Sequence, residues 1–234
     1  MADVITHDFS DAGAQAVALA AHVAAQLRGA IATRGHAVIA VSGGSTPKAF
    51  FAQLSNEALD WSAVTVTLVD ERWVPDTDER SNARLVKSVL LQNEATAARF
   101  VPLYTGAATP EEGLAAAAAR IAALPAPFDA VLLGMGDDGH TASFFPGGDH
   151  LAEATDPHGK AKVWPMRAAG AGEPRITLSL NALLDTRALY LLVCGAGKRD
   201  LLAAVQQGVA AAKEYPVRCV VMQDSVPLAV YWSP

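Results

Sequence analysis

The chain has 234 residues, 51% of them hydrophobic, and a formal net charge of −6 at pH 7. This length and composition suffice for one large domain or two small ones with a sizeable core. The acidic balance argues against sequence-independent binding of nucleic acid or of an anionic membrane surface, because both need clustered basic charge. Local anion sites remain compatible with it.

Cysteine usage and the amino-terminal sequence bear on where the protein works. Cys194 and Cys219 each lie in an apolar run and indicate core thiols in a reducing compartment. The sequence contains no CxxC or HExxH pattern, either of which would indicate a metal site. The first residues lack the features of a secretory signal, and no stretch approaches the ~20 apolar residues of a membrane span. We therefore expect a cytoplasmic protein and, without a long linker or internal repeat, a single domain over residues 1–234.

A glycine-rich loop follows the first predicted strand. Residues 11–32 are alanine-rich with apolar residues about one helical turn apart, which predicts a helix, and residues 37–41 predict a short buried strand. The strand runs into SGGSTPK and a second helix, an arrangement that points backbone amides and the positive end of a helix dipole at an anion. The spacing matches neither a P-loop nor a dinucleotide fingerprint, and an ordinary capped turn is the alternative interpretation. The candidate phosphate ligands are Gly43, Gly44, Ser45 and Thr46.

A charged triplet ends the next predicted strand, residues 64–69. Asp70 and Glu71 are candidates for a paired acid site, and Arg72 is a candidate for binding phosphate or developing negative charge. The alternative is a local ion pair that closes the loop. The following Ser-Asn pair predicts the start of a helix that continues to residue 91.

The central strand leads to the candidate catalytic residues. A strand at 101–103, a helix at 110–123 and a Pro-Ala-Pro linker precede the apolar run 128–133, which ends in a glycine-rich turn with Asp137, Asp138 and His140. Ligands of open α/β sheets bind at the carboxyl ends of such strands. Histidine exchanges protons near neutrality, and neighbouring carboxylates can orient or charge it. A turn with a solvated histidine cap is the alternative.

The last third repeats the α/β pattern. After Gly148 the composition is loop-like, and we interpret His150 and His158 as solvated surface residues. Two cations then lie at the ends of predicted strands. Arg175 begins a strand at 175–180, and Lys198 lies between a strand at 188–194 and a helix at 199–206, where it can bind phosphate or simply be solvated. Residues 217–222 and 228–232 predict the final strands.

The order of these motifs is similar to that of a known family. VSGGSTP, VDERWVP with SNARL, FDAVLLGMGDDGHTASFFPG, RITLSLNALL and LLVCGAGK resemble the 6-phosphogluconolactonases from about Val38 to Lys198. The chain resembles more weakly the glucosamine-6-phosphate deaminases and isomerases, which share the fold and the glycine loop. Those deaminases have a segment like GHIAFNEPG, whose glutamate corresponds to Phe145 here, and a DEY-like triplet where this chain has DER. Both departures favour the lactonases.

The resemblance implies a Rossmann-like three-layer α/β/α fold with a mainly parallel sheet. It also implies hydrolysis of 6-phospho-D-glucono-1,5-lactone to 6-phosphogluconate in the oxidative pentose phosphate pathway, without metal or organic cofactor. His140 would be the general base, and Asp138 would orient it or bind a sugar hydroxyl. Arg72 would stabilise the oxyanion or hold the substrate, and Lys198 and the glycine loop would bind phosphate. Arg175 is a second cationic candidate, and Asp70 is a further candidate for binding the substrate.

Two other functions remain open at this stage. An isomerase or deaminase could use the same scaffold, although Phe145 counts against it. A non-catalytic sugar-phosphate sensor usually carries an output domain such as a helix-turn-helix, and the sequence predicts none. The expected partner is a small sugar-phosphate lactone, with no nucleic acid or membrane, and the expected assembly is a monomer or weak homodimer.

Overall fold

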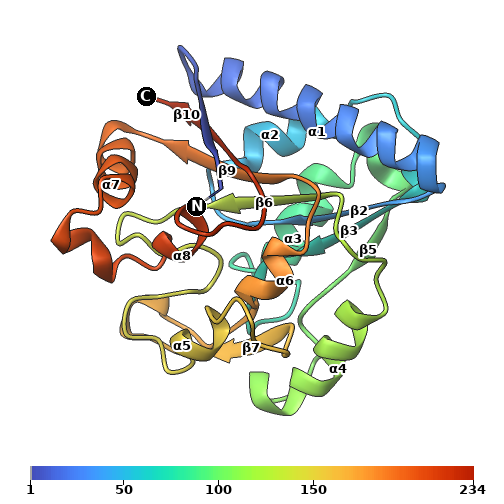
Figure 1. The fold of residues 1–234 in the computed structure, drawn as a ribbon. Coiled ribbons are helices and arrows are strands. Elements are labelled where there is room, and N and C mark those ends of the chain that lie inside the picture. Colours follow the sequence, from blue (N-terminus) through green and yellow to red (C-terminus); the bar gives the residue numbers. More distant parts are fainter. Residues whose placement is uncertain (1) are drawn as a thin grey trace.

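A computed structural model describes residues 2–234, and a seven-stranded parallel sheet forms its centre (Figure 1). The strands lie in the order β1-β10-β9-β6-β2-β3-β5, and all adjacent pairs are parallel. Their bounds are β1 Val4–Asp8, β2 Ala37–Val41, β3 Val64–Leu68, β5 Arg99–Val101, β6 Ala130–Gly134, β9 Leu189–Cys194 and β10 Leu228–Ser233. The chain runs outward from β2 in one direction and from β6 in the other, so the order reverses between these two strands. Ligands of such sheets bind at this reversal point.

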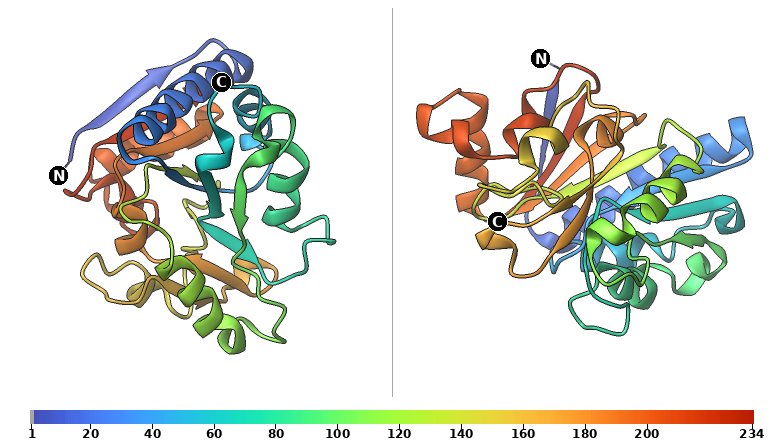
Figure 2. Two further views of the ribbon diagram at one scale, coloured as in Figure 1. Left: turned by 90° about the vertical axis from the view of Figure 1, so that its right-hand side faces the viewer. Right: turned by 90° about the horizontal axis from the view of Figure 1, so that it is seen from below.

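Helices cover the sheet on both sides. Helix α1 (Ala12–Arg34) lies along one face beside α2 (Pro47–Leu54), whereas α6 (Leu180–Leu184) lies on the other side, as Figures 1 and 2 show. The remaining helices are α3 Asn82–Leu85, α4 Pro110–Ala122, α5 Leu151–Ala154, α7 Ala196–Gln206 and α8 Arg218–Val221. Short turns of 3-10 or π helix are η1 Trp61–Ala63, η2 Val86–Leu90, η3 Asn93–Ala97, η4 Ala169–Ala171 and η5 Ala210–Glu214. The mainly parallel α/β fold with flanking helices is therefore confirmed.

Helix α1 corrects one expectation from the sequence. Its length and hydropathy satisfy the simple criteria for a membrane span, so the expectation that no stretch of the chain approaches these criteria is wrong. The cause is its alanine content, which raises the mean hydropathy without forming a continuous apolar surface. Leu19, Val23 and Leu27, four residues apart, form a fully buried stripe, whereas Val17 on another face is exposed. This pattern is typical of a helix that packs on a protein core.

A second, antiparallel sheet contributes half of the functional cavity. It has the order β4-β8-β7, formed by β4 (Asp70–Arg72), β8 (Arg175–Leu178) and β7 (Val163–Met166). Strand β4 follows β3 after one residue, so the Asp-Glu-Arg triplet is itself a strand and not a loop. Pairing of β4 with β8 sets Arg72 opposite Arg175. Two arginines that are distant in the sequence are thereby brought to one place.

Three further expectations differ from the structure. Residues 217–222 predicted a strand, but they contain helix α8, because a short apolar run has the same composition in a buried strand and a buried helix. His150 is not a solvated residue: its ring stacks on Trp164 with 5.5 Å between centroids, and its Nδ1 is buried. Cys194 and Cys219 are free thiols, as expected, but both are only partly buried.

Candidate active site

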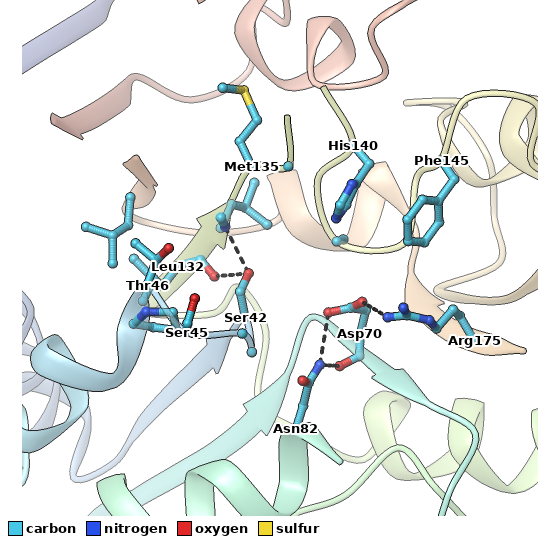
Figure 3. Close-up of a pocket in the computed structure, with 18 of the residues that line it drawn as sticks. Ser42, Ser45, Thr46, Asp70, Asn82, Leu132, Met135, His140, Phe145 and Arg175 are labelled. Carbon is cyan, nitrogen blue, oxygen red and sulfur yellow. Dashed lines mark hydrogen bonds and ion pairs between the residues drawn. The ribbon is translucent and has the colours of Figure 1, made fainter. Parts of the chain in front are cut away.

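A cavity of about 260 Å³ lies at the carboxyl ends of β2, β6 and β9, beside the antiparallel sheet (Figure 3). It therefore occupies the point where the strand order reverses. Nine of the predicted site residues line it: Gly43, Gly44, Ser45, Thr46, Asp70, Arg72, His140, Arg175 and Lys198. The three candidates that do not line it are Glu71, Asp137 and Asp138. The structure thus brings together residues from five separate segments of the chain.

His140 and Asp138 form a hydrogen-bonded pair on the loop after β6. The Nδ1 atom of His140 lies 2.6 Å from Oδ1 of Asp138, and the His140 backbone amide donates to the same oxygen at 3.1 Å. Because a carboxylate accepts hydrogen bonds, this contact assigns a proton to Nδ1 and leaves Nε2 as the basic atom. Burial raises the pKa of Asp138, but the bonds from His140 outweigh it, so that this pKa lies below its ordinary value. Asp138 stays ionised and orients the imidazole.

Asp137 does not share that role. Its side chain is 94% exposed, and its nearest ionic partner is Lys198, with 3.7 Å between Oδ1 and Nζ. Only one of the two aspartates before His140 therefore contacts the imidazole. Lys198 lies in the first turn of α7, where backbone amides also favour an anion.

Gly136 makes room for the imidazole. A Cβ atom added there would lie less than 2.5 Å from Cε1 and Nδ1 of His140, and 2.8 Å from Oδ1 of Asp138. Gly139 has a φ of +73°, which suits glycine, and its carbonyl accepts a hydrogen bond from the amide of Val217 at 2.8 Å. These two glycines fold the loop tightly and connect it to the segment that begins α8.

Phe145 contacts both the candidate base and one candidate cation. Its ring stacks on His140, with 4.4 Å between ring centroids and 29° between ring planes. The Cζ atom of Arg175 lies 5.3 Å from the same ring centroid. Figure 3 shows these three side chains gathered on one side of the cavity.

The glycine loop is connected to the strand that carries His140. The Ser42 hydroxyl donates to the carbonyl of Leu132 and accepts from the amide of Gly134, each at 3.0 Å. These bonds join the end of β2 to the end of β6. Thr46, at the start of α2, makes no side-chain capping bond within the described residues, so its hydroxyl can face a ligand.

Asp70 is the buried centre of a polar network. The Ser143 hydroxyl donates to Oδ2 of Asp70 at 2.6 Å, and Asn82 Nδ2 donates to the Asp70 carbonyl at 3.0 Å. Nη1 of Arg175 is 3.9 Å from the same Oδ2. Burial lowers the pKa of Arg175, and the charge of Asp70 opposes this shift. Asp70 therefore balances a buried guanidinium.

Asn82 lines the cavity, although its sequence context indicates only the start of a helix. A Cβ atom on Gly43 would lie less than 2.5 Å from Oδ1 of Asn82, so the amide packs directly against the glycine loop. Its position between Gly43 and Asp70 could not be read from a helix-capping pattern. The nearby SNARL motif was the only signal available.

Glu71 is not part of an acid pair. Its fully buried carboxylate accepts bonds from the amides of Arg72, Asn82 and Ala83 and from the Ser81 hydroxyl, at 2.7 to 3.0 Å. Burial raises the pKa of Glu71 to about 6, although these four donors oppose the shift. The carboxylate thus holds the start of α3, and both the paired-acid and the ion-pair interpretations are wrong.

Arg72 projects from β4 into the cavity. Its Nη1 donates to the Arg80 carbonyl at 2.5 Å, and among residues 2–234 its buried Nε has no hydrogen-bond partner. Arg72, Arg175 and Lys198 give the cavity a net positive lining in an acidic protein.

A doubly wound sheet with a glycine loop, three cations and an oriented histidine at its reversal point defines an α/β protein whose cavity has the lining suited to a small anionic ligand. The family model of glucosamine-6-phosphate isomerases/6-phosphogluconolactonase matches residues 10–232. The chain belongs to this family, as the order of its motifs predicted.

Curated relatives match this chain over almost its whole length. It is 53% identical to a 6-phosphogluconolactonase from Rhizobium meliloti, covering 97% of this chain and 98% of the relative. It is 50% identical to a 6-phosphogluconolactonase from Mesorhizobium japonicum, covering 97% and 94%.

Solved structures extend the likeness to the fold. A 6-phosphogluconolactonase from Shewanella baltica has a TM-score of 0.93 and 39% identity, covering 99% of this chain and 98% of that one. A monomeric glucosamine-6-phosphate deaminase has a TM-score of 0.76 and 17% identity, covering 97% and 96%. The deaminase shares the fold alone.

Proposed function

We propose that this protein hydrolyses 6-phospho-D-glucono-1,5-lactone to 6-phosphogluconate by His140-assisted attack of water on the lactone carbonyl. The observation that carries the proposal is the His140–Asp138 pair, which leaves Nε2 as the basic atom inside a cavity lined by cations. High identity to 6-phosphogluconolactonases over nearly the full length supports the choice of substrate. The reaction belongs to the oxidative pentose phosphate pathway.

The reaction needs one group that moves a proton twice. Nε2 of His140 accepts a proton as water attacks the carbonyl carbon, and a tetrahedral oxyanion forms. When this intermediate collapses, the bond to the ring oxygen breaks and the imidazolium returns its proton to that oxygen. A δ-lactone is an activated ester, so positioning of water and one proton shuttle suffice. The sequence contains no GxSxG pattern that would indicate a serine nucleophile.

The cations divide between the two ends of the substrate. The glycine loop and Lys198 surround one part of the cavity, where amide and ammonium donors suit a phosphate. Arg72 and Arg175 come from the antiparallel sheet, and we assign them to the lactone side, where a guanidinium stabilises the oxyanion. Replacing a phosphate ligand should chiefly raise KM, whereas replacing an oxyanion ligand should lower kcat. Kinetics of Lys198→Ala and Arg175→Ala distinguish these assignments.

His140→Ala tests the proposed function. The variant should lose about 10²–10⁴-fold in turnover, the usual range for loss of a general base. The assay follows base consumption with freshly prepared lactone, since the product acid ionises at neutral pH. His158→Ala is the control, because this histidine is exposed on a loop outside the cavity. Full activity in purified His140→Ala would refute the mechanism.

The same assay separates the alternative functions. A deaminase would release ammonia from glucosamine 6-phosphate, but the apolar ring of Phe145 occupies the side of the cavity next to His140 and offers no acid. A sensor would bind a sugar phosphate without turnover. We further propose that residues 1–234 act as one cytoplasmic domain, as a monomer or weak homodimer, without metal or organic cofactor. Activity that persists after chelation would support the last point.

A further inference from the structure

We propose that Phe145 is a positioning residue, whose ring fixes the His140 imidazole relative to the Arg175 guanidinium. The inference rests on the proposed lactone hydrolysis, because that reaction requires the base and the oxyanion cation to face one carbonyl group. Phe145 is only 2% exposed although it lines the cavity, so its ring is held by the core.

The imidazole needs a restraint besides Asp138. The two residues belong to the same tight turn, and their side chains are 33% and 44% exposed for His140 and Asp138. Their hydrogen bond therefore sets the tautomer and directs Nδ1 of the imidazole toward Asp138. It does not fix the imidazole relative to the rest of the cavity, because both partners belong to the same loop. Stacking on Phe145 restrains the ring plane, with 4.4 Å between centroids. The buried phenyl ring thus holds the imidazole of His140 in a fixed position relative to the protein core.

Polar contacts alone also leave the guanidinium of Arg175 incompletely fixed. Its Nη2 and Nε both donate to a single acceptor, the Ala171 carbonyl, at 2.7 and 3.3 Å. Oδ2 of Asp70 is 3.9 Å from Nη1, beyond hydrogen-bond distance. The Phe145 ring, 5.3 Å from Cζ, is within the range of a cation–π interaction. This contact gives the arginine head a second, non-polar support.

The backbone around Phe145 explains why its ring can serve both groups. The amide of Phe144 donates to the Thr141 carbonyl at 2.9 Å, and the Phe145 carbonyl accepts from the amide of Gly148 at 3.0 Å. One residue before Phe144, the Ser143 hydroxyl donates to Asp70 on β4. The segment is therefore fixed to both the His140 turn and the antiparallel sheet, and Phe145 spans the gap between them.

The kinetic test compares two neighbouring phenylalanines. Phe145→Leu keeps an apolar side chain but removes the aromatic face, and we expect kcat to fall about 10- to 100-fold, the scale of a misplacement of about 1 Å, with KM little changed. Phe145→Tyr keeps the face and should retain most of the wild-type kcat. Phe144→Leu is the matched control, because Phe144 is fully buried and lies outside the cavity lining. It should lower thermal stability and leave kcat unchanged.

A spectroscopic readout tests the contact without activity. Ring current from Phe145 should shift the His140 side-chain proton resonances upfield, and Phe145→Leu should abolish that shift whereas Phe144→Leu should not. Wild-type kcat in Phe145→Leu, an equal loss of kcat in both leucine variants, or an unchanged His140 resonance would each overturn the inference. Failure of the proposed function would appear differently, as a wild-type protein that hydrolyses no lactone.

Discussion

Replacing Gly136 with alanine tests the geometry of the candidate base. The added Cβ would lie less than 2.5 Å from Cε1 and Nδ1 of His140, whereas ordinary van der Waals contact begins at 3.4 Å. It would also lie 2.8 Å from Oδ1 of Asp138, so the hydrogen-bonded pair must move as a unit. The imidazole therefore has to retreat by about 1 Å, a displacement that typically costs 10²-fold in rate.

We expect Gly136→Ala to lower kcat by about 10²-fold. KM should change less, because the glycine loop and Lys198 belong to other segments. The backbone of Gly136 does not adopt a left-handed φ, so alanine is compatible with the fold there. Thermal unfolding should show a folded protein, and base consumption during lactone hydrolysis measures the rate.

A double variant identifies the cause of the loss. If the Cβ acts by displacing the imidazole, Gly136→Ala should cost nothing further in the His140→Ala background. The control is Gly29→Ala in α1, where an added Cβ meets nothing within 4 Å and activity should be unchanged. Wild-type kcat in Gly136→Ala, or the full loss repeated without His140, would refute the proposed geometry.

Two further predictions concern carboxylates. Asp138→Asn should lower kcat by about 10²-fold or more, because an amide can donate to Nδ1 and move the imidazole proton to Nε2; an unchanged pH-stat rate would contradict this. Burial raises the pKa of Glu71 to about 6 in the folded protein from its ordinary value of 4.5, so the folded protein retains a proton that the unfolded chain loses between these values. Relative to Glu71→Gln, the wild-type free energy of unfolding should therefore fall by about 1 kcal/mol as the pH rises from 4.5 to 6. Urea unfolding at both pH values checks the sign.

The parallel half of the fold could be predicted from local sequence. Strand β2 spans the predicted residues 37–41, because a short apolar run next to a glycine loop leaves few alternatives. Strand β1 (Val4–Asp8) was missed because it mixes polar and apolar residues at the edge of the sheet. The apolar run of α8 was assigned to a strand because composition alone cannot separate a buried helix from a buried strand.

The candidate site could be predicted only in part, and the reason is tertiary pairing. His140 and the glycine loop follow strands that run into one edge of the parallel sheet, so their convergence follows from the strand order. The approach of Arg72 to Arg175 depends on the pairing of β4 with β8, which joins residues about a hundred positions apart. No local pattern indicates such a pair. For Glu71 the sequence predicted a functional role that the structure does not support, because its carboxylate accepts hydrogen bonds from backbone amides at the start of α3.

The base and the two arginines of the candidate site lie on different sheets. The base belongs to the parallel sheet, whereas both arginines belong to the antiparallel sheet. Two contacts described here cross between the base-bearing loop and those arginines or their counter-ion: the Ser143 hydroxyl bond to Asp70, and the packing of Phe145 on Arg175. A substitution that loosened either contact would leave each sheet folded and each charge present, yet separate proton transfer from oxyanion stabilisation. Loosening of Phe145 should therefore lower kcat in a protein that stays folded, as for Gly136→Ala. Loss of the buried Ser143 hydroxyl should lower stability as well, because it removes a donor to the buried Asp70 carboxylate.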